Sequence, residues 1–168
     1  PTGAIFSKKT MEAIASLCKE HNLWLISDEV YKEIYYDAVP VSATSLDIPD
    51  RAVVVSSLSK SHAMTGWRLG WIIAPKPLCK HLNNLLSSML FGAPMFIQDA
   101  AVTALEDKHI TQTMRGIYKA RRDLFCQHLA RVERINVHTP AGGMFLLLDV
   151  RQTGLDSQTF ANRLYEQE

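Results

Sequence analysis

Two short apolar runs, each followed at once by polar side chains, constrain the fold of this 168-residue chain most strongly. Residues 23–27 form the first run and precede Asp28, and residues 53–56 form the second and lead into Lys60. Continuous apolar runs of this length are typical of strands buried on both faces of a parallel sheet. Ligands bind at the carboxyl ends of such strands, so Asp28 and Lys60 would converge if the strands are neighbours. The pattern predicts an α/β fold with a ligand site at that edge.

Lys60 lies in a loop, residues 57–70, that also carries two hydroxyls and an arginine. An amine attacks an aldehyde only when unprotonated, so a reactive lysine must be desolvated or surrounded by positive charge. A lysine at the end of a buried strand suits covalent capture of a phosphorylated aldehyde, namely pyridoxal phosphate held as a Schiff base. The alternative is an ordinary surface lysine in a serine-rich loop, because short motifs occur by chance.

Arg68, eight residues after the lysine, would complete a site for the phosphate group. Its planar fork of donors matches a phosphate dianion, and the hydroxyls of Ser57 and Ser59 can donate to the remaining oxygens. Gly66 and Gly70 are expected to let the backbone of this loop turn tightly. The loop therefore predicts a phosphate site next to the lysine.

Asp28 and Tyr31 follow the first apolar run and can serve the same cofactor. A carboxylate at this point can pair with a protonated pyridine nitrogen, which keeps the ring an electron sink for a carbanion at the substrate α-carbon. The Tyr31 phenol can reach the ring oxygen beside the imine. The alternatives are a helix N-cap for Asp28 and an ordinary half-buried aromatic for Tyr31. Glu29 has no assigned role and is expected on a solvated face or behind the site.

Helices and short strands account for the rest of the chain. Helices are expected over residues 7–21, 77–91, 97–105 and 110–132 and from residue 157, and further strands over residues 69–74, 135–138 and 144–150. The first two strands are predicted to be parallel, and the third to be antiparallel because it returns soon after the lysine loop.

Together these segments resemble the class I/II aminotransferases, the pyridoxal-phosphate enzymes of fold type I. The resemblance rests on residues 1–3, 27–31, 57–70 and 140–145. It implies a mixed, mostly parallel sheet with helices, which forms part of the cofactor-binding large domain, plus the start of the small α+β C-terminal domain.

The resemblance also implies domain boundaries. Residues 1–109 would belong to the large domain, residues 110–132 would form the connecting helix, and residues 133–168 would begin the small domain. Pro1-Thr2-Gly3 is similar to an Asn-Pro-Thr-Gly motif whose asparagine would precede residue 1. The family's glycine-rich phosphate loop, ring-stacking aromatic residue and carboxylate-binding arginine are not found. We therefore expect a middle-to-late part of a longer enzyme, inactive when made alone.

Carried over residue by residue, the resemblance implies that Lys60 forms the internal aldimine and later moves the proton between the substrate α-carbon and the cofactor. Asp28 would bind the pyridinium nitrogen and Tyr31 the ring oxygen. Three side chains would bind the phosphate: Ser57, Ser59 and Arg68. The activity implied is amino-group transfer between an amino acid and a 2-oxo acid, by a ping-pong mechanism, in a cytoplasmic homodimer.

Two other functions remain open. A carbon–sulfur β-lyase on the same scaffold would share the cofactor chemistry, because substrate positioning alone selects the outcome. An aminotransferase-like effector domain of a transcription regulator is the other, although residues 64–71 are more similar to the enzymes. Residues 57–75 and 89–101 are similar to arginine:pyruvate aminotransferases, which suggests arginine and pyruvate as a guess for donor and acceptor.

The charge balance gives no electrostatic case for binding nucleic acid or a membrane, because 18 Lys and Arg against 17 Asp and Glu leave a net charge of +1. The three cysteines, Cys18, Cys79 and Cys126, lack metal-ligand or disulfide spacing and are predicted to be reduced, buried thiols. His62 receives no catalytic role. A basic stretch, Lys119, Arg121 and Arg122, is predicted to be a solvated helix face.

Overall fold

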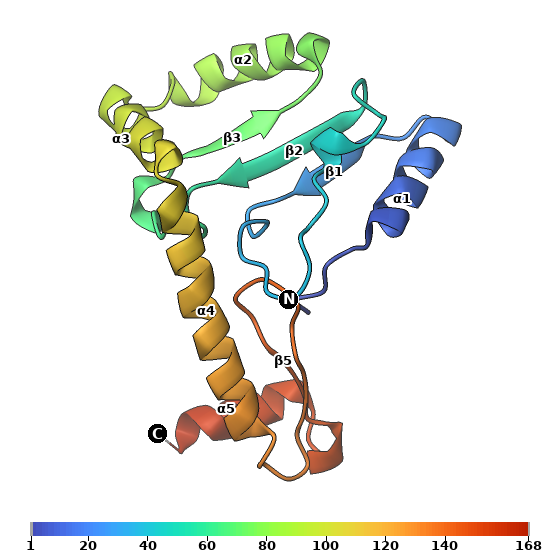
Figure 1. Ribbon diagram of the computed structural model, residues 1–168, viewed down its shortest axis with the longest axis vertical. Coiled ribbons are helices and arrows are strands. Elements are labelled where there is room, and N and C mark those ends of the chain that lie inside the picture. The colour runs from blue at the N-terminus through green and yellow to red at the C-terminus, as the bar shows by residue number, and fades with distance from the viewer. Residues whose placement is uncertain (1, 168) are drawn as a thin grey trace.

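The computed structural model describes residues 2–167. Within this range the chain forms a three-stranded sheet, a two-stranded sheet and five α-helices (Figure 1). Their bounds are α1 (Lys8–Glu20), β1 (Leu25–Asp28), β2 (Ala52–Ser57), β3 (Gly70–Ile73), α2 (Lys76–Leu90), α3 (Met95–Glu106), α4 (Lys108–Leu129), β4 (Asn136–His138), β5 (Leu147–Asp149) and α5 (Ser157–Glu166). The predicted elements all occur, with bounds shifted by a few residues.

The larger sheet has the strand order β1-β2-β3. Strands β1 and β2 are parallel, with Asp28 opposite Val55, and β2 and β3 are antiparallel, with Ser57 opposite Gly70. Both predicted strand directions are confirmed. Because β1 and β2 are parallel neighbours, their carboxyl ends meet at one edge of the sheet, as the sequence pattern requires.

One hydrophobic cluster joins α1 to the sheet. Met11 and Ala15 on one side of α1 pack with Ile48 and with Val54 of β2, all of them buried. The helix begins at the N-cap Ser7, whose side chain accepts a hydrogen bond from the backbone N–H of Thr10. Its apolar spacing buries one stripe and leaves the other side in solvent.

A second cluster anchors the lysine loop. Leu58, only 1% exposed, packs with Ala101 and Ala104 of α3, and Met64 and Trp71 close the cluster from the side. Small residues on α3 allow this close approach. The backbone that leads from β2 to Lys60 is thus held against α3. Ser57 and Ser59, the neighbours of Leu58, line a cavity instead.

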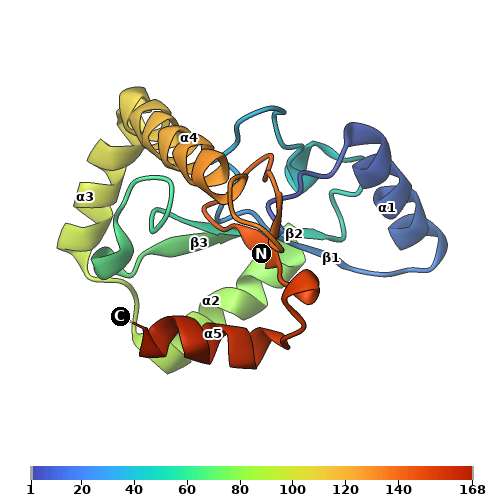
Figure 2. The ribbon, with the colours of Figure 1, turned by 90° about the horizontal axis from the view of Figure 1, so that it is seen from below.

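Helix α4 runs from the larger sheet to the small sheet of β4 and β5, beside which α5 lies (Figures 1 and 2). The strand expected over residues 144–150 is shorter than predicted, because β5 covers only Leu147–Asp149. The residues before it pair elsewhere, since Gly142 forms an antiparallel bridge with Tyr35. No helix among residues 2–167 has the length and apolarity needed to cross a membrane.

Candidate active site

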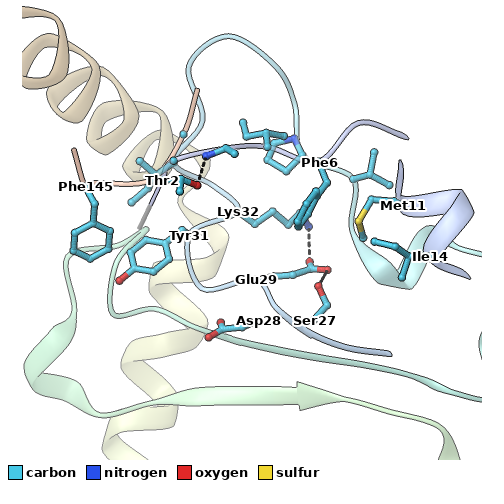
Figure 3. Close-up of a pocket in the computed structure, with 18 of the residues that line it drawn as sticks. Thr2, Phe6, Met11, Ile14, Ser27, Asp28, Glu29, Tyr31, Lys32 and Phe145 are labelled. Atoms are coloured by element: carbon cyan, nitrogen blue, oxygen red, sulfur yellow. Dashed lines mark hydrogen bonds and ion pairs between the residues drawn. The ribbon is translucent and has the colours of Figure 1, made fainter. Parts of the chain in front are cut away.

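A cavity of about 410 Å³ lies beside the carboxyl end of β1 (Figure 3). Asp28 and Tyr31 line it together with Gly3, near the beginning of the chain, and with Gly143 and Phe145, which follow α4 and β4. Three of the segments singled out in the sequence therefore meet here. The larger sheet and the segment around residue 143 are far apart in the sequence and adjacent in space.

Asp28 is exposed at the end of β1, and one of its carboxylate oxygens accepts a hydrogen bond from the backbone N–H of Val30 at 3.1 Å. The alternative of a helix N-cap is wrong, because residues 30–33 form turns and no α-helix follows. The short turn holds the carboxylate at the mouth of the cavity. Its second oxygen has no hydrogen-bond partner within residues 2–167 and can accept from a ligand.

Tyr31 is half-buried, and its ring meets the ring of Phe145 edge to face, with centroids 5.5 Å apart and planes at 72° (Figure 3). Such pairs fix the relative orientation of the two rings. Phe145 belongs to a segment that carried the family resemblance, but it received no role from the sequence. The pairing of the loop around residue 142 with residues 34–36 brings it here.

Ser57, Ser59 and Arg68 line a second cavity, of about 580 Å³, between β2, β3 and α2. The Ser57 hydroxyl accepts a hydrogen bond from the backbone N–H of Ser59 at 3.3 Å, and the exposed Arg68 donates to the carbonyl of Thr65 at 3.0 Å. The three predicted phosphate ligands are therefore together. Lys60 lies in the turn that follows Ser59 and lines neither of the two cavities.

Gly66 lies in the 3₁₀ turn Thr65–Trp67 of the lysine loop, but neither Gly66 nor Gly70 takes a left-handed conformation. The left-handed positions of the loop are Ala63 (φ 54°) and Arg68 (φ 53°). Gly70 is instead needed for close approach, since a Cβ there would lie 2.7 Å from the carbonyl oxygen of Ser56. A Cβ on Gly66 would meet no atom within 4 Å.

Of the two positions expected for Glu29, the solvated face is wrong, because its side chain is only 9% exposed, and Glu29 lines the cavity together with Asp28. Its carboxylate accepts hydrogen bonds from the Ser42 hydroxyl at 2.8 Å and from the backbone N–H of Ala43 at 2.8 Å, and it pairs with Lys32. Glu29 therefore ties the end of β1 to the 3₁₀ turn at Ala43–Ser45. This structural role keeps the neighbouring Asp28 in place.

His62 is half-buried, and its Nδ1 lies 2.8 Å from the Ser61 hydroxyl. Burial lowers its pKa below the ordinary value, although Glu33 and Asp107 act in the opposite direction. The side chain is thus a hydrogen-bonded structural residue. Among residues 2–167, no group of three or more His, Cys, Asp or Glu side chains is placed to hold a metal ion.

Burial differs from the sequence-based prediction at two further places. The three cysteines are free, but only Cys18 is buried, while Cys79 and Cys126 are half-buried. Arg122 was predicted on a solvated helix face and is 8% exposed, because acidic and aromatic partners from other segments surround it. Its neighbour Arg121 is exposed as predicted.

Comparison with known proteins gives one consistent result. The family described as aminotransferase class I and II matches residues 1–168. An arginine–pyruvate transaminase of Pseudomonas aeruginosa is 51% identical over 168 residues, which cover 99% of this chain and 43% of that protein. An aspartate aminotransferase of Musicola paradisiaca is 33% identical, over 95% of this chain and 41% of that protein.

Solved structures agree with the sequence matches. An aromatic aminotransferase from Pyrococcus horikoshii superposes with a TM-score of 0.91 and 37% identity, over 96% of this chain and 44% of that one. An aspartate aminotransferase from Thermus thermophilus with maleate gives a TM-score of 0.92 and 30% identity, over 99% and 44%. The chain thus spans less than half the length of these relatives.

These matches confirm the predicted fold class, a part of the fold type I large domain with the start of the small domain. The boundaries at residues 109 and 132 stay predictions. The family matches residues 1–168, and the solved structures named above cover nearly all of this chain, so the chain belongs to the class I and II aminotransferases.

Proposed function

We propose that the protein is a pyridoxal-phosphate-dependent aminotransferase, which moves an amino group from an amino acid to a 2-oxo acid. One observation carries the proposal: the family match covers the whole chain, and its lysine loop follows β2 directly, beside the strand that presents Asp28. Lys60 would hold the cofactor covalently, as a Schiff base, because its amine follows β2 at the carboxyl edge of the two parallel strands and lies in the loop that carries the family resemblance.

The functional groups at this edge fit pyridoxal phosphate. An amine, a carboxylate and a phenol follow the ends of β1 and β2, and a guanidinium and two hydroxyls line the second cavity. When bound, the cofactor supplies an electron sink for the negative charge that develops at the substrate α-carbon. Asp28 would hold the proton on the pyridine nitrogen, and the phenol of Tyr31 would donate to the ring oxygen.

Three side chains that line one cavity would bind the phosphate: Ser57, Ser59 and Arg68. Arg68 is exposed, and a single hydrogen bond to the Thr65 carbonyl leaves most of its five donors for a ligand. Its left-handed backbone is strained for a residue with a side chain, and such strain tends to concentrate at ligand-binding positions.

Lys60 also moves the substrate proton. With cofactor and substrate bound, the free Nζ of Lys60 would accept the proton from the substrate α-carbon and donate it again. The similarity to an arginine–pyruvate transaminase makes arginine and pyruvate the first pair to assay. We expect the active protein to be a homodimer, which sedimentation measures directly.

The test is an amino-donor screen of the full-length protein loaded with pyridoxal phosphate, with pyruvate as the acceptor. We expect alanine and a new 2-oxo acid in equal amounts without release of ammonia, and loss of nearly all turnover in Lys60→Ala. A carbon–sulfur lyase would instead release ammonia and a thiol from a thioether amino acid without any acceptor. That product pattern, or full turnover in Lys60→Ala, would refute the proposal.

A further inference from the structure

Two arginines of α4 pack on two consecutive tyrosines that follow β1. The guanidinium of Arg115 lies 3.7 Å from the ring centre of Tyr35, and that of Arg122 lies 4.4 Å from the ring centre of Tyr36. Seven residues, about two helical turns, separate the arginines, so both project from one side of α4. Both contacts join the helix to the segment that contains Tyr31.

Arg122 is the more constrained of the two. It is the only buried charged side chain among residues 2–167. Its Nη1 donates to the carbonyl of Pro140 at 2.9 Å and to Asp37 at 3.0 Å, and its Nε donates to Asp123 at 2.8 Å. Burial lowers the pKa of Arg122, but its hydrogen bonds to Asp123 and Asp37 raise it above the ordinary value, so the charge is kept.

The loop that reaches the candidate site begins at Pro140, whose carbonyl accepts a hydrogen bond from Arg122. The loop pairs with the tyrosine segment, because the N–H of Tyr36 donates to Ala141 at 2.9 Å and that of Gly143 donates to Ile34 at 2.7 Å. The Tyr36 hydroxyl donates in turn to the carbonyl of Gly143. Arg122 therefore holds the start of the loop and, through the ring of Tyr36, its middle.

The end of this loop touches the cofactor side of the site. Phe145, two residues after Gly143, presents its ring to Tyr31, and both rings line the cavity that Asp28 borders (Figure 3). A continuous series of direct contacts thus leads from Arg122 through the loop to the ring of Tyr31. Asp28 lies outside the series, because Val30 and Glu29 fix its position.

We propose that Arg122 is a positioning residue of the aminotransferase site. By holding residues 140–143 against Tyr36, it keeps Phe145 on the ring of Tyr31 and so aims the Tyr31 phenol at the cofactor ring oxygen. The inference rests on the proposed function, and specifically on the role of Tyr31. It assigns Arg122 no contact with substrate or cofactor.

The test follows the pH at which the absorbance of the bound cofactor changes in the holoenzyme. Loss of the phenol in Tyr31→Phe leaves more negative charge on the ring oxygen, which favours the protonated cofactor and raises that pH by about 1 unit. Arg122→Met should shift it in the same direction by roughly half as much, and should add nothing in the Tyr31→Phe background, because both changes act through one contact.

Two further variants distinguish a specific effect of Arg122 from misfolding. Tyr36→Phe removes only the hydroxyl that donates to Gly143, and should give a smaller shift in the same direction. Arg121→Met removes the exposed neighbouring arginine and should leave the profile unchanged. Unchanged pH profiles in both Arg122→Met and Tyr36→Phe would overturn the inference about Arg122 but not the proposed function. Additive shifts of Arg122→Met and Tyr31→Phe in the double variant would do the same. No shift in Tyr31→Phe itself would overturn the proposed role of Tyr31, and the inference with it.

Discussion

At the scale of single residues, two side chains assigned to cofactor binding, Asp28 and Arg68, lie where a strand or a helical turn ends. Asp28 closes β1 and is held by a short turn, and Arg68 ends a 3₁₀ turn in a left-handed conformation with φ 53° and ψ 42°. Such a conformation costs about 1–2 kcal/mol for a residue with a Cβ. The loop tolerates it because Leu58 and its cluster anchor the neighbouring backbone.

Asp28→Asn and Arg68→Ala should separate two functions of the site. Asparagine cannot hold the pyridine nitrogen protonated, so Asp28→Asn should keep cofactor but lose at least about a hundredfold in kcat, or roughly 2.7 kcal/mol. Arg68→Ala removes a charged phosphate donor and should mainly raise the dissociation constant of the cofactor, by about tenfold or more. Cofactor titration and steady-state rates check both, and equal, modest effects on both quantities would contradict the assignment.

At the scale of elements, the contact between β2 and β3 depends on a missing side chain. Gly70→Ala would place a Cβ 2.7 Å from the Ser56 carbonyl oxygen and 3.1 Å from the Ser57 Cβ, within the sheet. We expect a loss of about 1–3 kcal/mol in unfolding free energy, as for other overpacked positions. Gly66→Ala is the matched control, because open space surrounds it, and it should change stability by no more than about 0.5 kcal/mol. Denaturant unfolding measures the loss of unfolding free energy in both variants. Equal losses in Gly70→Ala and Gly66→Ala would show that the close contact at Gly70 is absent.

The turn between β2 and β3 should also respond to pH through His62. Burial lowers the folded-state pKa of His62 below 6.5, so the unfolded chain binds the proton first as the pH falls. The unfolding free energy should therefore decrease as the pH drops below 6.5, and His62 should contribute no slope above it. His62→Gln, which cannot titrate, should flatten this part of the profile. An unchanged slope in that variant would show that the histidine is equally protonated in both states.

The order and direction of the elements could be predicted from the sequence, because apolar spacing and the two strand ends are local signals. Three features could not, since each depends on residues far apart in the chain. Arg122 is buried by Asp37 and Pro140, the strand before Leu147 is shortened by pairing at Tyr35, and Phe145 reaches Tyr31 through the same loop. Local patterns carry no information on such contacts.

At the scale of the whole molecule, large apolar side chains remain exposed around the join of α2 and α3. Phe91 is 96% exposed, Met95 is 72% exposed and Met89 is 67% exposed. Exposed apolar side chains that lie this close together in the chain favour association. We expect the 168-residue chain to self-associate with rising concentration in sedimentation experiments, and Phe91→Ser with Met95→Ser to weaken this. Val39→Ser, at an exposed position elsewhere, is the control. A monomer at all concentrations would contradict the expectation.

Attachment of the cofactor to Lys60 is the central claim, and one measurement tests it most directly. The protein loaded with pyridoxal phosphate is reduced with borohydride, which fixes a Schiff base permanently, and is then digested and mapped by mass spectrometry. We expect a single modified peptide that carries the pyridoxyl group on Lys60, and none in Lys60→Ala. A modification on another lysine, or no modification in protein that retains the cofactor, would show that Lys60 is not the anchor and would contradict the account.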